Sequence, residues 1–395
     1  MRTGLLCVVA LAALSVTGCR DARAGGARHA PAPIVVGALV SSSGRTSFIG
    51  QPEANTLRAH IDDLNAAGGI DGHRLELQLF DTRGEPDTAA AAARQLVANP
   101  RVAAIIGPST TAETMAVVPV VEAARVPLMS LAAGDEVVKP VRPWVFKDAP
   151  GDTQAVGRIY DHLARRDVAR VAIACADDSF GRGGEAALKE MAEAAGIRVV
   201  ASTRFSATTP DSAALARFIS DVKRSDAGAL ITWATRPGPA IVARLARASD
   251  LPQMLIFSHG IASREFLDEA GPAAEGILFP GSLLLVSDTL AWNHPLRAVE
   301  SQYSRWYESR FHTPASSFGG HAWDALNLFR DGLNATLPMA GGEPSRVKLR
   351  AWLEETRNFI GTGGRYHFSP ADHNGLGRDA FVMIRVESGH WTLAR

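Results

Sequence analysis

Short apolar runs alternate with amphipathic segments from residue 34 onward. The first runs predict buried strands at 34–40 (IVVGALV), 74–80 (RLELQLF), 102–107 (VAAIIG) and 126–131 (VPLMSL). The segment after the first run predicts a helix with one apolar face, on which lie Ala54, Leu57, Ile61 and Leu64. The pair Gly68-Gly69 supplies the end of this helix. Strands that alternate with helices in this way predict a parallel sheet wrapped by crossover helices.

The same alternation starts again near residue 150. Strands are predicted at 170–176, 197–203, 228–233 and 253–258, and helices at 152–165, 183–195, 212–223 and 239–248. A mostly helical region follows from about 294 to 355, and strands return in GRYHFS (364–369) and DAFVMIRV (379–386). Two α/β units of about 120 residues each fit the size at which a single core stops growing.

The predicted architecture is therefore α/β with two lobes joined by hinge crossings. We expect the first lobe to comprise residues 34–148 and about 279–360, and the second to comprise 149–278 and about 361–395. Each lobe is expected to hold a parallel sheet flanked by helices. Because open α/β sheets bind ligands at the carboxyl ends of their strands, the binding cleft is expected there.

The beginning of the chain has the pattern of an export signal. Arg2 precedes an apolar run at 5–16, which is shorter than the roughly 20 residues of a permanent membrane span. The sequence VTGC ending at Cys19 resembles the lipobox of bacterial lipoproteins, in which cleavage leaves this cysteine to carry a lipid. An ordinary cleaved signal with an incidental cysteine is the alternative. We expect a signal peptide at 1–18 and a flexible lipidated tether at 19–33, because DARAGGARHAPAP has no apolar periodicity.

Charge and cysteine content bear on the possible partners and on disulfide formation. The chain has 395 residues with 41 Lys and Arg against 41 Asp and Glu, so nothing in its charge favours nucleic acid as a partner. Of the three cysteines, Cys7 lies in the expected signal and Cys19 is the expected lipidation site, which leaves Cys175 without a disulfide partner. Cys175 lies in the apolar run VAIACA, which favours a buried packing role over a reactive thiol.

Four collinear segments carry a family resemblance. They are VVGALVSSSGRTSFIGQPEANTLRAHIDDLNAAGGIDGHRLELQLFDTRGEPDTAAAAARQLV (35–97), AAIIGPSTTAETMAVVPVVEAARVPLMSLAA (103–133), DDSFGRGG (177–184) and HAWDALNLFRDGL (321–333). Together they resemble the periplasmic binding proteins of branched-chain amino acid importers of the ABC class. The resemblance implies a two-lobed type I fold that closes on a small organic acid or amino acid and delivers it to an ABC permease in the inner membrane. It also implies a periplasmic or cell-surface location for the anchored lipoprotein, and we expect a monomer without a cofactor or metal.

The first lobe supplies an expected carboxylate site. Pro108 ends the strand AAIIG, and a helix then begins whose free backbone amides and dipole favour an anion. The residues at this helix start are Ser109, Thr110, Thr111 and Ala112. The resemblance implies that Thr111 holds the ligand carboxylate. Capping of the helix by Thr110 or Thr111 is the alternative and does not exclude that role.

Two further positions depart from the amino-acid binders of the family. The loop SLAAG is expected to face the helix start, and the resemblance implies a ligand contact from the carbonyl of Ala132, with Ala133 beside it. Gly134 stands where those binders commonly place a hydroxyl side chain. His259 follows the strand QMLIFS, where they place a carboxylate that pairs with the ligand ammonium group. A structural role for His259 is the alternative to a ligand contact.

These departures favour a ligand without an ammonium group. An imidazole does not replace a counter-charge, and an unpaired buried ion costs on the order of several kcal/mol. We therefore favour an aromatic or aliphatic carboxylic acid, and an amino acid or amide, with Asp152 or Asp178 as acceptor, is the alternative. The resemblance places four aromatic residues in the cleft wall, although each taken alone favours core packing: Phe48, Phe180, Trp233 and Trp323.

Catalytic motifs are missing from the sequence, which contains no G-x-S-x-G, G-x-G-x-x-G, Walker, C-x-x-C or H-E-x-x-H pattern. The run 177–179 (DDS) favours helix capping over a hydrolase site. His367, Asp372 and His373 favour a solvated turn over a metal site, since Pro370 lies between them. We expect a binding protein rather than an enzyme. A sensor of the same fold that signals to a receptor and, in another class, an exported α/β hydrolase or dehydrogenase are the alternatives.

Overall fold

The structure is a computed structural model that describes residues 1, 31–338 and 342–394. The expected signal peptide, apart from Met1, and residues 19–30 of the expected tether lie outside the described residues, and so does Cys19. The predictions for this segment therefore stay predictions. None of the helices in the described ranges is both long enough and apolar enough to cross a membrane.

The first sheet is entirely parallel. Its strands are β1 (Ile34–Val40), β2 (Leu75–Asp81), β3 (Val102–Ile106), β4 (Leu128–Ser130) and β5 (Val145–Lys147), in the order β2-β1-β3-β4-β5. All seven residues of β1 are buried, because strands pair with β1 on both sides and helices cover both faces of the sheet. The near-continuous apolar runs of the sequence reflect this burial.

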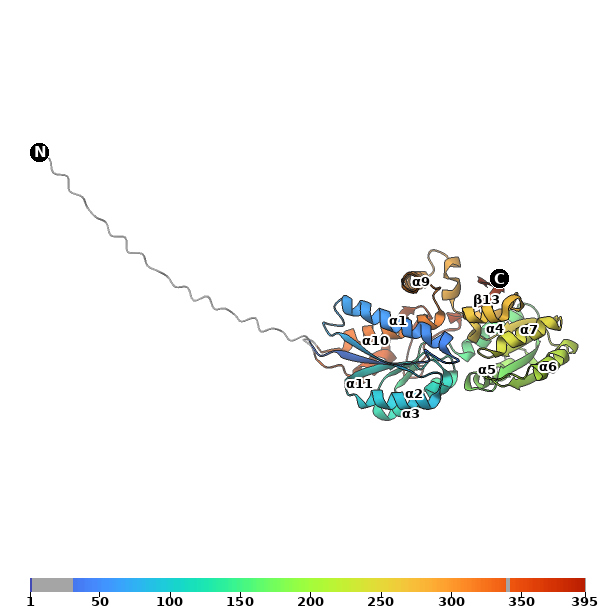
Figure 1. Cartoon of the computed structure of the whole chain (residues 1–395), viewed down its shortest axis with the longest axis horizontal. Helices are drawn as coiled ribbons and strands as arrows, with labels where there is room; N and C mark the ends of the chain where they lie inside the picture. The colour runs from blue at the N-terminus through green and yellow to red at the C-terminus, as the bar shows by residue number, and fades with distance from the viewer. Residues whose placement is uncertain (2–30, 339–341, 395) are drawn as a thin grey trace. The chain divides into compact units, whose positions relative to one another are not determined.

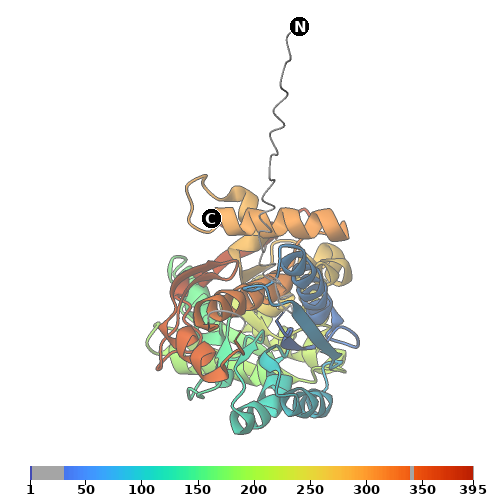
Figure 2. The ribbon, with the colours of Figure 1, turned by 90° about the vertical axis from the view of Figure 1, so that its left-hand side faces the viewer.

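Helices lie on both faces of the first sheet. One face packs against α1 (Ser47–Ala66), α10 (Ser317–Thr336) and α11 (Arg346–Glu355) in one apolar cluster, and the other face packs against α2 (Pro86–Ala98) and α3 (Thr111–Ala124) in a second cluster. Figure 1 shows α1 and α10 on one side and α2 and α3 on the other. Figure 2 shows the blue helix α1 and the cyan helices α2 and α3 on either side of the blue strands.

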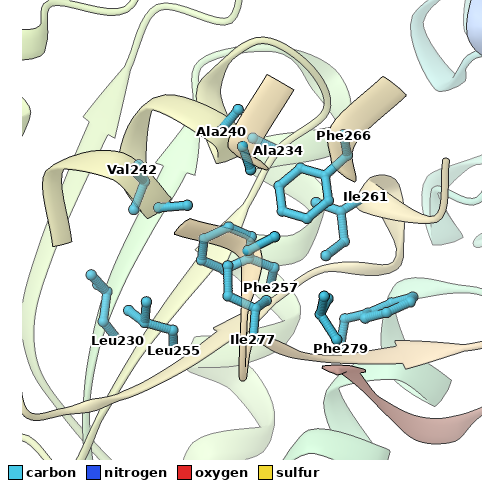
Figure 3. Close-up of a cluster of buried hydrophobic side chains, with 14 of the residues drawn as sticks. Leu230, Ala234, Ala240, Val242, Leu255, Phe257, Ile261, Phe266, Ile277 and Phe279 are labelled. Carbon is cyan, nitrogen blue, oxygen red and sulfur yellow. The ribbon is translucent and has the colours of Figure 1, made fainter. Parts of the chain in front are cut away.

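The second sheet repeats the first and extends it. Its order is β7-β6-β8-β9-β10-β13-β14, with parallel pairs from β7 to β10 and antiparallel pairs thereafter. The strands are β6 (Arg170–Ala176), β7 (Arg198–Phe205), β8 (Ala229–Trp233), β9 (Met254–Phe257), β10 (Leu278–Gly281), β13 (Val382–Glu387) and β14 (His390–Leu393). Helices α4 (Asp152–Ala164) and α5 (Ser179–Ala192) pack on one face. Helices α6 (Ser212–Arg224), α7 (Gly238–Ala248) and α8 (Arg264–Ala270) pack on the other, where Phe257, Phe266 and Phe279 belong to a large apolar cluster (Figure 3).

The remaining described elements are α9 (Arg297–Phe311), a two-stranded sheet and short 3-10 helices. The two-stranded sheet pairs β11 (Arg357–Gly361) with β12 (Gly364–His367). In the first sheet β2 pairs on one side of β1 and β3 pairs on its other side. In the second sheet β7 and β8 lie on the two sides of β6 in the same way. This arrangement places a topological switch point between β1 and β3 and another between β6 and β8, where the loops diverge and ligands can enter.

The structure confirms the α/β class and the parallel sheets flanked by helices. The predicted lobe boundaries are displaced at two places. The boundary at about 279 falls inside β10, which belongs to the second sheet, and the return at about 361 is too early. Tyr366 and Phe368 pack in the core of the first sheet, and the chain rejoins the second sheet only at Val382. Apolar runs predict that a strand is buried, but they do not say which of two sheets buries it.

Candidate functional site

A cavity of about 120 Å³ lies at the carboxyl ends of the strands, at both switch points. Loops after all five strands of the first sheet line it, together with the start of α1 and the first two turns of α10. Loops after β6, β8, β9 and β10 of the second sheet line the other side. The lining residues are Arg45, Thr46, Ile49, Gly84, Ser109, Thr110, Thr111, Ala112, Leu131, Ala133, Ala149, Pro150, Asp178, Ser179, Phe180, Thr235, His259, Gly260, Ala262, Gly281, Ser282, Ser317, Phe318, His321 and Phe381.

Seven of the twelve predicted ligand-binding residues line this cavity: Ser109, Thr110, Thr111, Ala112, Ala133, Phe180 and His259. The other five do not line it: Phe48, Ala132, Gly134, Trp233 and Trp323.

The start of α3 presents three hydroxyl groups, and two of them are engaged within the protein. Ser109 accepts a hydrogen bond from the Ser41 amide at 3.0 Å and donates its own proton to Glu53. Thr110 caps α3, accepting from the Glu113 amide at 3.4 Å and donating to its carboxylate at 2.6 Å. The capping prediction for Thr110 is therefore confirmed.

Thr111 differs from its two neighbours. Its hydroxyl oxygen accepts from the Gly134 amide at 3.2 Å, which leaves the hydroxyl proton free for another acceptor. Thr111 is also the first residue of α3, so its own amide and that of Ala112 belong to the first turn and have no acceptor within the helix. A free hydroxyl proton and two free amides at the positive end of a helix form a site for a carboxylate.

Two buried ionisable groups lie behind this site. Burial raises the pKa of Glu53, whose carboxyl group accepts the Ser109 proton, well above its usual range. Lys147 is fully buried, and its Nζ donates to the carbonyls of Ala133 at 2.8 Å and Ala149 at 3.0 Å, both of which line the cavity. Burial lowers the pKa of Lys147, and Asp135 at 3.9 Å opposes that shift. The amino group of Lys147 therefore lies directly behind the cavity wall.

Gly134 lies behind Thr111 rather than in the cavity wall. A Cβ atom at this glycine would lie 2.5 Å from Cγ2 and 2.7 Å from Oγ1 of Thr111. A side chain there would displace Thr111 from its hydrogen bond to the Gly134 amide. The absence of a hydroxyl side chain at position 134 thus reflects the close packing of the Thr111 side chain.

His259 lies among aromatic rings on the second-sheet side of the cavity. Its ring lies edge-to-face with Phe180 at 5.1 Å and with Trp233 at 5.6 Å, and tilted against Phe381 at 5.1 Å between ring centroids. Both ring nitrogens are buried without a hydrogen-bond partner in the described part of the chain. Burial, and then the charge of Lys147, lower the pKa of His259 to about 3. The imidazole is therefore neutral at physiological pH and has an unused donor and an unused acceptor.

Three of the predicted aromatic residues pack elsewhere. Trp233 is fully buried beneath His259, against α5 at Gly184, where a Cβ atom would lie 2.1 Å from the indole nitrogen. Trp323 stacks on His60 at 4.0 Å, away from the cavity. Phe48 packs edge-on against Phe318 at 5.9 Å and beneath the guanidinium of Arg236 at 5.3 Å, so it supports the wall from outside.

Several lining residues were not predicted, above all Phe318, His321 and Phe381. Phe318 and His321 lie three positions apart in α10 and therefore share one face of the helix. Trp323 lies two positions after His321, a turn of about 200°, so it faces away. The segment HAWDALNLFRDGL marked this helix, but its sequence does not tell which face meets the cavity.

The structure shows where the residues weighed as catalytic, reactive or metal-binding groups lie. Asp178 caps α5 by accepting from the Gly181 amide at 2.8 Å, as predicted. Cys175 is fully buried, and burial raises its pKa to about 12, which confirms the packing role. The prediction of a solvated turn is wrong for His373, which is fully buried. Its ring is hydrogen-bonded to Val145 O at 2.9 Å and to Glu354 at 3.1 Å. Within residues 31–338 and 342–394, no group of His, Cys, Asp and Glu is arranged to hold a metal ion.

Comparison with known proteins places the chain among binding proteins. A family model described as periplasmic binding protein matches residues 33–390. Leu/Ile/Val-binding protein homolog 8 of Brucella abortus (strain 2308) is 28% identical over 195 residues, which are 47% of this chain and 48% of that protein. The chain thus spans about half the length of that relative. Leu/Ile/Val-binding protein BraC3 of Rhizobium johnstonii is 22% identical over 362 residues, 91% of this chain and 93% of its own.

Solved structures share the fold. An extracellular ligand-binding receptor from Rhodopseudomonas palustris HaA2 is 26% identical with a TM-score of 0.82, covering 92% of this chain and 100% of its own. The substrate-binding protein LivJ of Streptococcus pneumoniae, in complex with isoleucine, has a TM-score of 0.76 at 23% identity and covers 92% and 99%. A solute-binding protein of an ABC transporter from R. palustris BisB5, in complex with 3,4-dihydroxybenzoic acid, has a TM-score of 0.75 at 20% identity and covers 91% and 95%. These relatives and neighbours are binding proteins, not enzymes.

Proposed function

The chain belongs to the periplasmic binding protein family, and from this premise we propose that it captures a small carboxylic acid outside the cytoplasm and delivers it to an ABC permease. The observation that carries the proposal is the free hydroxyl proton of Thr111 at the start of α3. A carboxylate placed there accepts from this hydroxyl and from the amides of Thr111 and Ala112. Charge-assisted hydrogen bonds of this kind are about twice as strong as neutral ones.

The ligand is proposed to lack an ammonium group. Asp178 is the one carboxylate side chain among the residues that line the cavity, and it is engaged in capping α5. Asp152 does not line the cavity and accepts from the Asp135 amide at 3.3 Å. A neutral His259 supplies no counter-charge for an ammonium group bound next to it, and an ammonium group left without a counter-charge costs on the order of several kcal/mol.

The body of the ligand is proposed to be apolar and flat enough to lie between aromatic rings. Phe180 and Phe381 line the second-sheet side of the cavity and Phe318 lines the first-sheet side. Structural neighbours bind either kind of ligand: LivJ was solved with isoleucine, and the R. palustris BisB5 protein with 3,4-dihydroxybenzoic acid. The identity of the ligand therefore rests on the residues of this cavity.

A thermal-shift screen followed by calorimetry tests the proposal. Leucine and valine are compared with their 2-oxo acids, and phenylalanine with phenylacetate and benzoate. A ligand present at 100 times its Kd stabilises the native state by about 2.7 kcal/mol, which raises Tm by a few degrees. We expect stabilisation by acids and none by the amino acids. Tight binding of leucine or valine with inert acids would restore the amino-acid assignment.

Export and anchoring complete the proposal. The pattern of residues 5–19 supports an exported protein whose Cys19 carries a lipid after cleavage. Such an anchor would hold the binding protein at the membrane that contains its permease. The tether at 19–33 would then allow the folded part to reach that permease.

A further inference from the structure

Two histidines line the cavity from opposite sides, and each has at least one buried ring nitrogen without a hydrogen-bond partner among residues 31–338 and 342–394. His259 follows β9 of the second sheet, whereas His321 lies in the second turn of α10, which packs on the first sheet. The two residues are 9% and 7% exposed. Nδ1 and Nε2 of His259 and Nδ1 of His321 are buried without a partner in the described ranges. Three unpaired nitrogens on two residues that line one cavity are an unusual concentration, because buried polar atoms are nearly always hydrogen-bonded.

Both rings are uncharged, which restricts the chemistry that they can recognise. Burial lowers the pKa of each to about 3, and the positive charge of Lys147 contributes to both shifts. A neutral imidazole carries one N–H donor and one bare nitrogen acceptor. A turn of the ring about χ2 exchanges its nitrogens and carbons, so either edge can present a nitrogen to the cavity. The pair therefore offers both a donor and an acceptor.

We propose that His259 and His321 form a specificity pair that selects carboxylic acids carrying a hydroxyl group at the end opposite the carboxylate. The hydroxyl donates its proton to the bare nitrogen of one ring and accepts the N–H of the other. This inference rests on the proposed function, because it takes the carboxylate to lie at Thr111. Phe180, Phe318 and Phe381 cover the apolar body between these two polar ends.

Other terminal groups fit the pair less well. An ammonium group has donors only and brings a charge that the same Lys147 field disfavours. A second carboxylate has acceptors only, so it leaves the bare nitrogens unpaired unless the rings become protonated against their burial. A methyl group satisfies neither ring, and each buried polar atom left unpaired is unfavourable. A hydroxyl is a group with a single heavy atom that meets a donor and an acceptor together.

The two rings also join the two halves of the site. Because His259 lies on the second-sheet side and His321 on the first-sheet side, one hydroxyl bonded to both bridges the cavity. The bridge forms only when the halves are together. A hydroxyl ligand should therefore favour the closed form more than its methyl analogue of similar size does.

Matched ligand pairs test the proposal on the purified full chain by calorimetry. Each pair sets a 4-hydroxyphenyl acid against its 4-methylphenyl analogue, with a carboxylate attached directly or through one or two methylenes. Terephthalate serves as the probe with a second carboxylate. In the wild type we expect the hydroxy acid of the best-fitting length to bind on the order of ten- to a hundredfold tighter than its methyl analogue.

Substitutions assign this preference to the pair. His321→Phe and His259→Phe keep a flat ring and remove the nitrogens, and each should reduce the preference to about threefold or less. His60→Phe is the matched control, since His60 is a buried histidine outside the cavity that stacks on Trp323. It should leave the preference unchanged.

The outcomes separate the two proposals. If acids bind but the wild type does not distinguish hydroxy from methyl analogues, the specificity pair is wrong and the proposed function stands. Tightest binding by terephthalate with proton uptake would replace the pair with a dianion site. If amino acids bind and no acid does, the proposed function is wrong, and the inference built on it is wrong as well.

Discussion

The hydroxyl of Thr111 has two separate roles, and its removal should affect affinity and stability independently. In Thr111→Val the side chain keeps its shape but loses the free proton that is proposed to reach the ligand carboxylate. A hydrogen bond to a charged group contributes about 1.5–3 kcal/mol, so the Kd should rise on the order of ten- to a hundredfold. The same substitution removes the acceptor of the Gly134 amide, which is bonded at 3.2 Å. Loss of the hydrogen bond to the Gly134 amide affects the free and the ligand-bound protein equally. It should therefore lower the free energy of unfolding by about 1–3 kcal/mol and add nothing to the change in Kd.

Two variants make the measurement specific. Thr111→Ser retains the hydroxyl and should bind within a few fold of the wild type. Thr110→Ala removes the cap of α3 and should cost about 1 kcal/mol of stability with an unchanged Kd, because the Thr110 hydroxyl is engaged with Glu113. Calorimetry with the tightest acid of the panel gives the Kd, and urea unfolding gives the stability. A folded Thr111→Val protein with wild-type affinity would refute the carboxylate site.

Four further predictions concern other parts of the chain. Cys19→Ser should release the exported protein from membranes into the soluble fraction, whereas a wild type that is itself soluble with an unmodified terminus would contradict the lipid anchor. His259 has a folded pKa of about 3, below its unfolded value of about 6.5, so its contribution to stability is present above pH 6.5 and lost as the pH falls. Between pH 6.5 and 4 the free energy of unfolding of His259→Gln should therefore fall less steeply than that of the wild type, by up to about 1.4 kcal/mol per pH unit. Urea unfolding at several pH values measures both slopes, and equal slopes would exclude the neutral buried ring. Trp233→Ala should lower the free energy of unfolding by about 3–5 kcal/mol, because the side chain is fully buried. Trp323→Phe should leave the Kd unchanged, and a large rise in its Kd would show that Trp323 belongs to the site.

The sequence by itself determined the class of fold and the position of the helix start at Thr111. Apolar runs of five to seven residues mark strands that are buried on both faces, and the β6 strand has the predicted bounds of 170–176. The hydroxyl residues after Pro108 marked the start of α3, because a helix start requires capping groups and free amides within a few neighbouring residues. These features are local, so spacing along the chain is enough to predict them.

The tertiary structure alone decided which side chains form the cavity. Trp233 packs in the core because Gly184 of α5 has no side chain and leaves room for the indole ring. His321 and Trp323 leave the same helix in nearly opposite directions, and only the packing of α10 on α1 decides which of them meets the cavity. Burial of a side chain depends on surfaces brought together from distant parts of the chain. Sequence spacing gives the face of a helix on which a residue lies, whereas the contact made by that face is set by the packing of the whole fold.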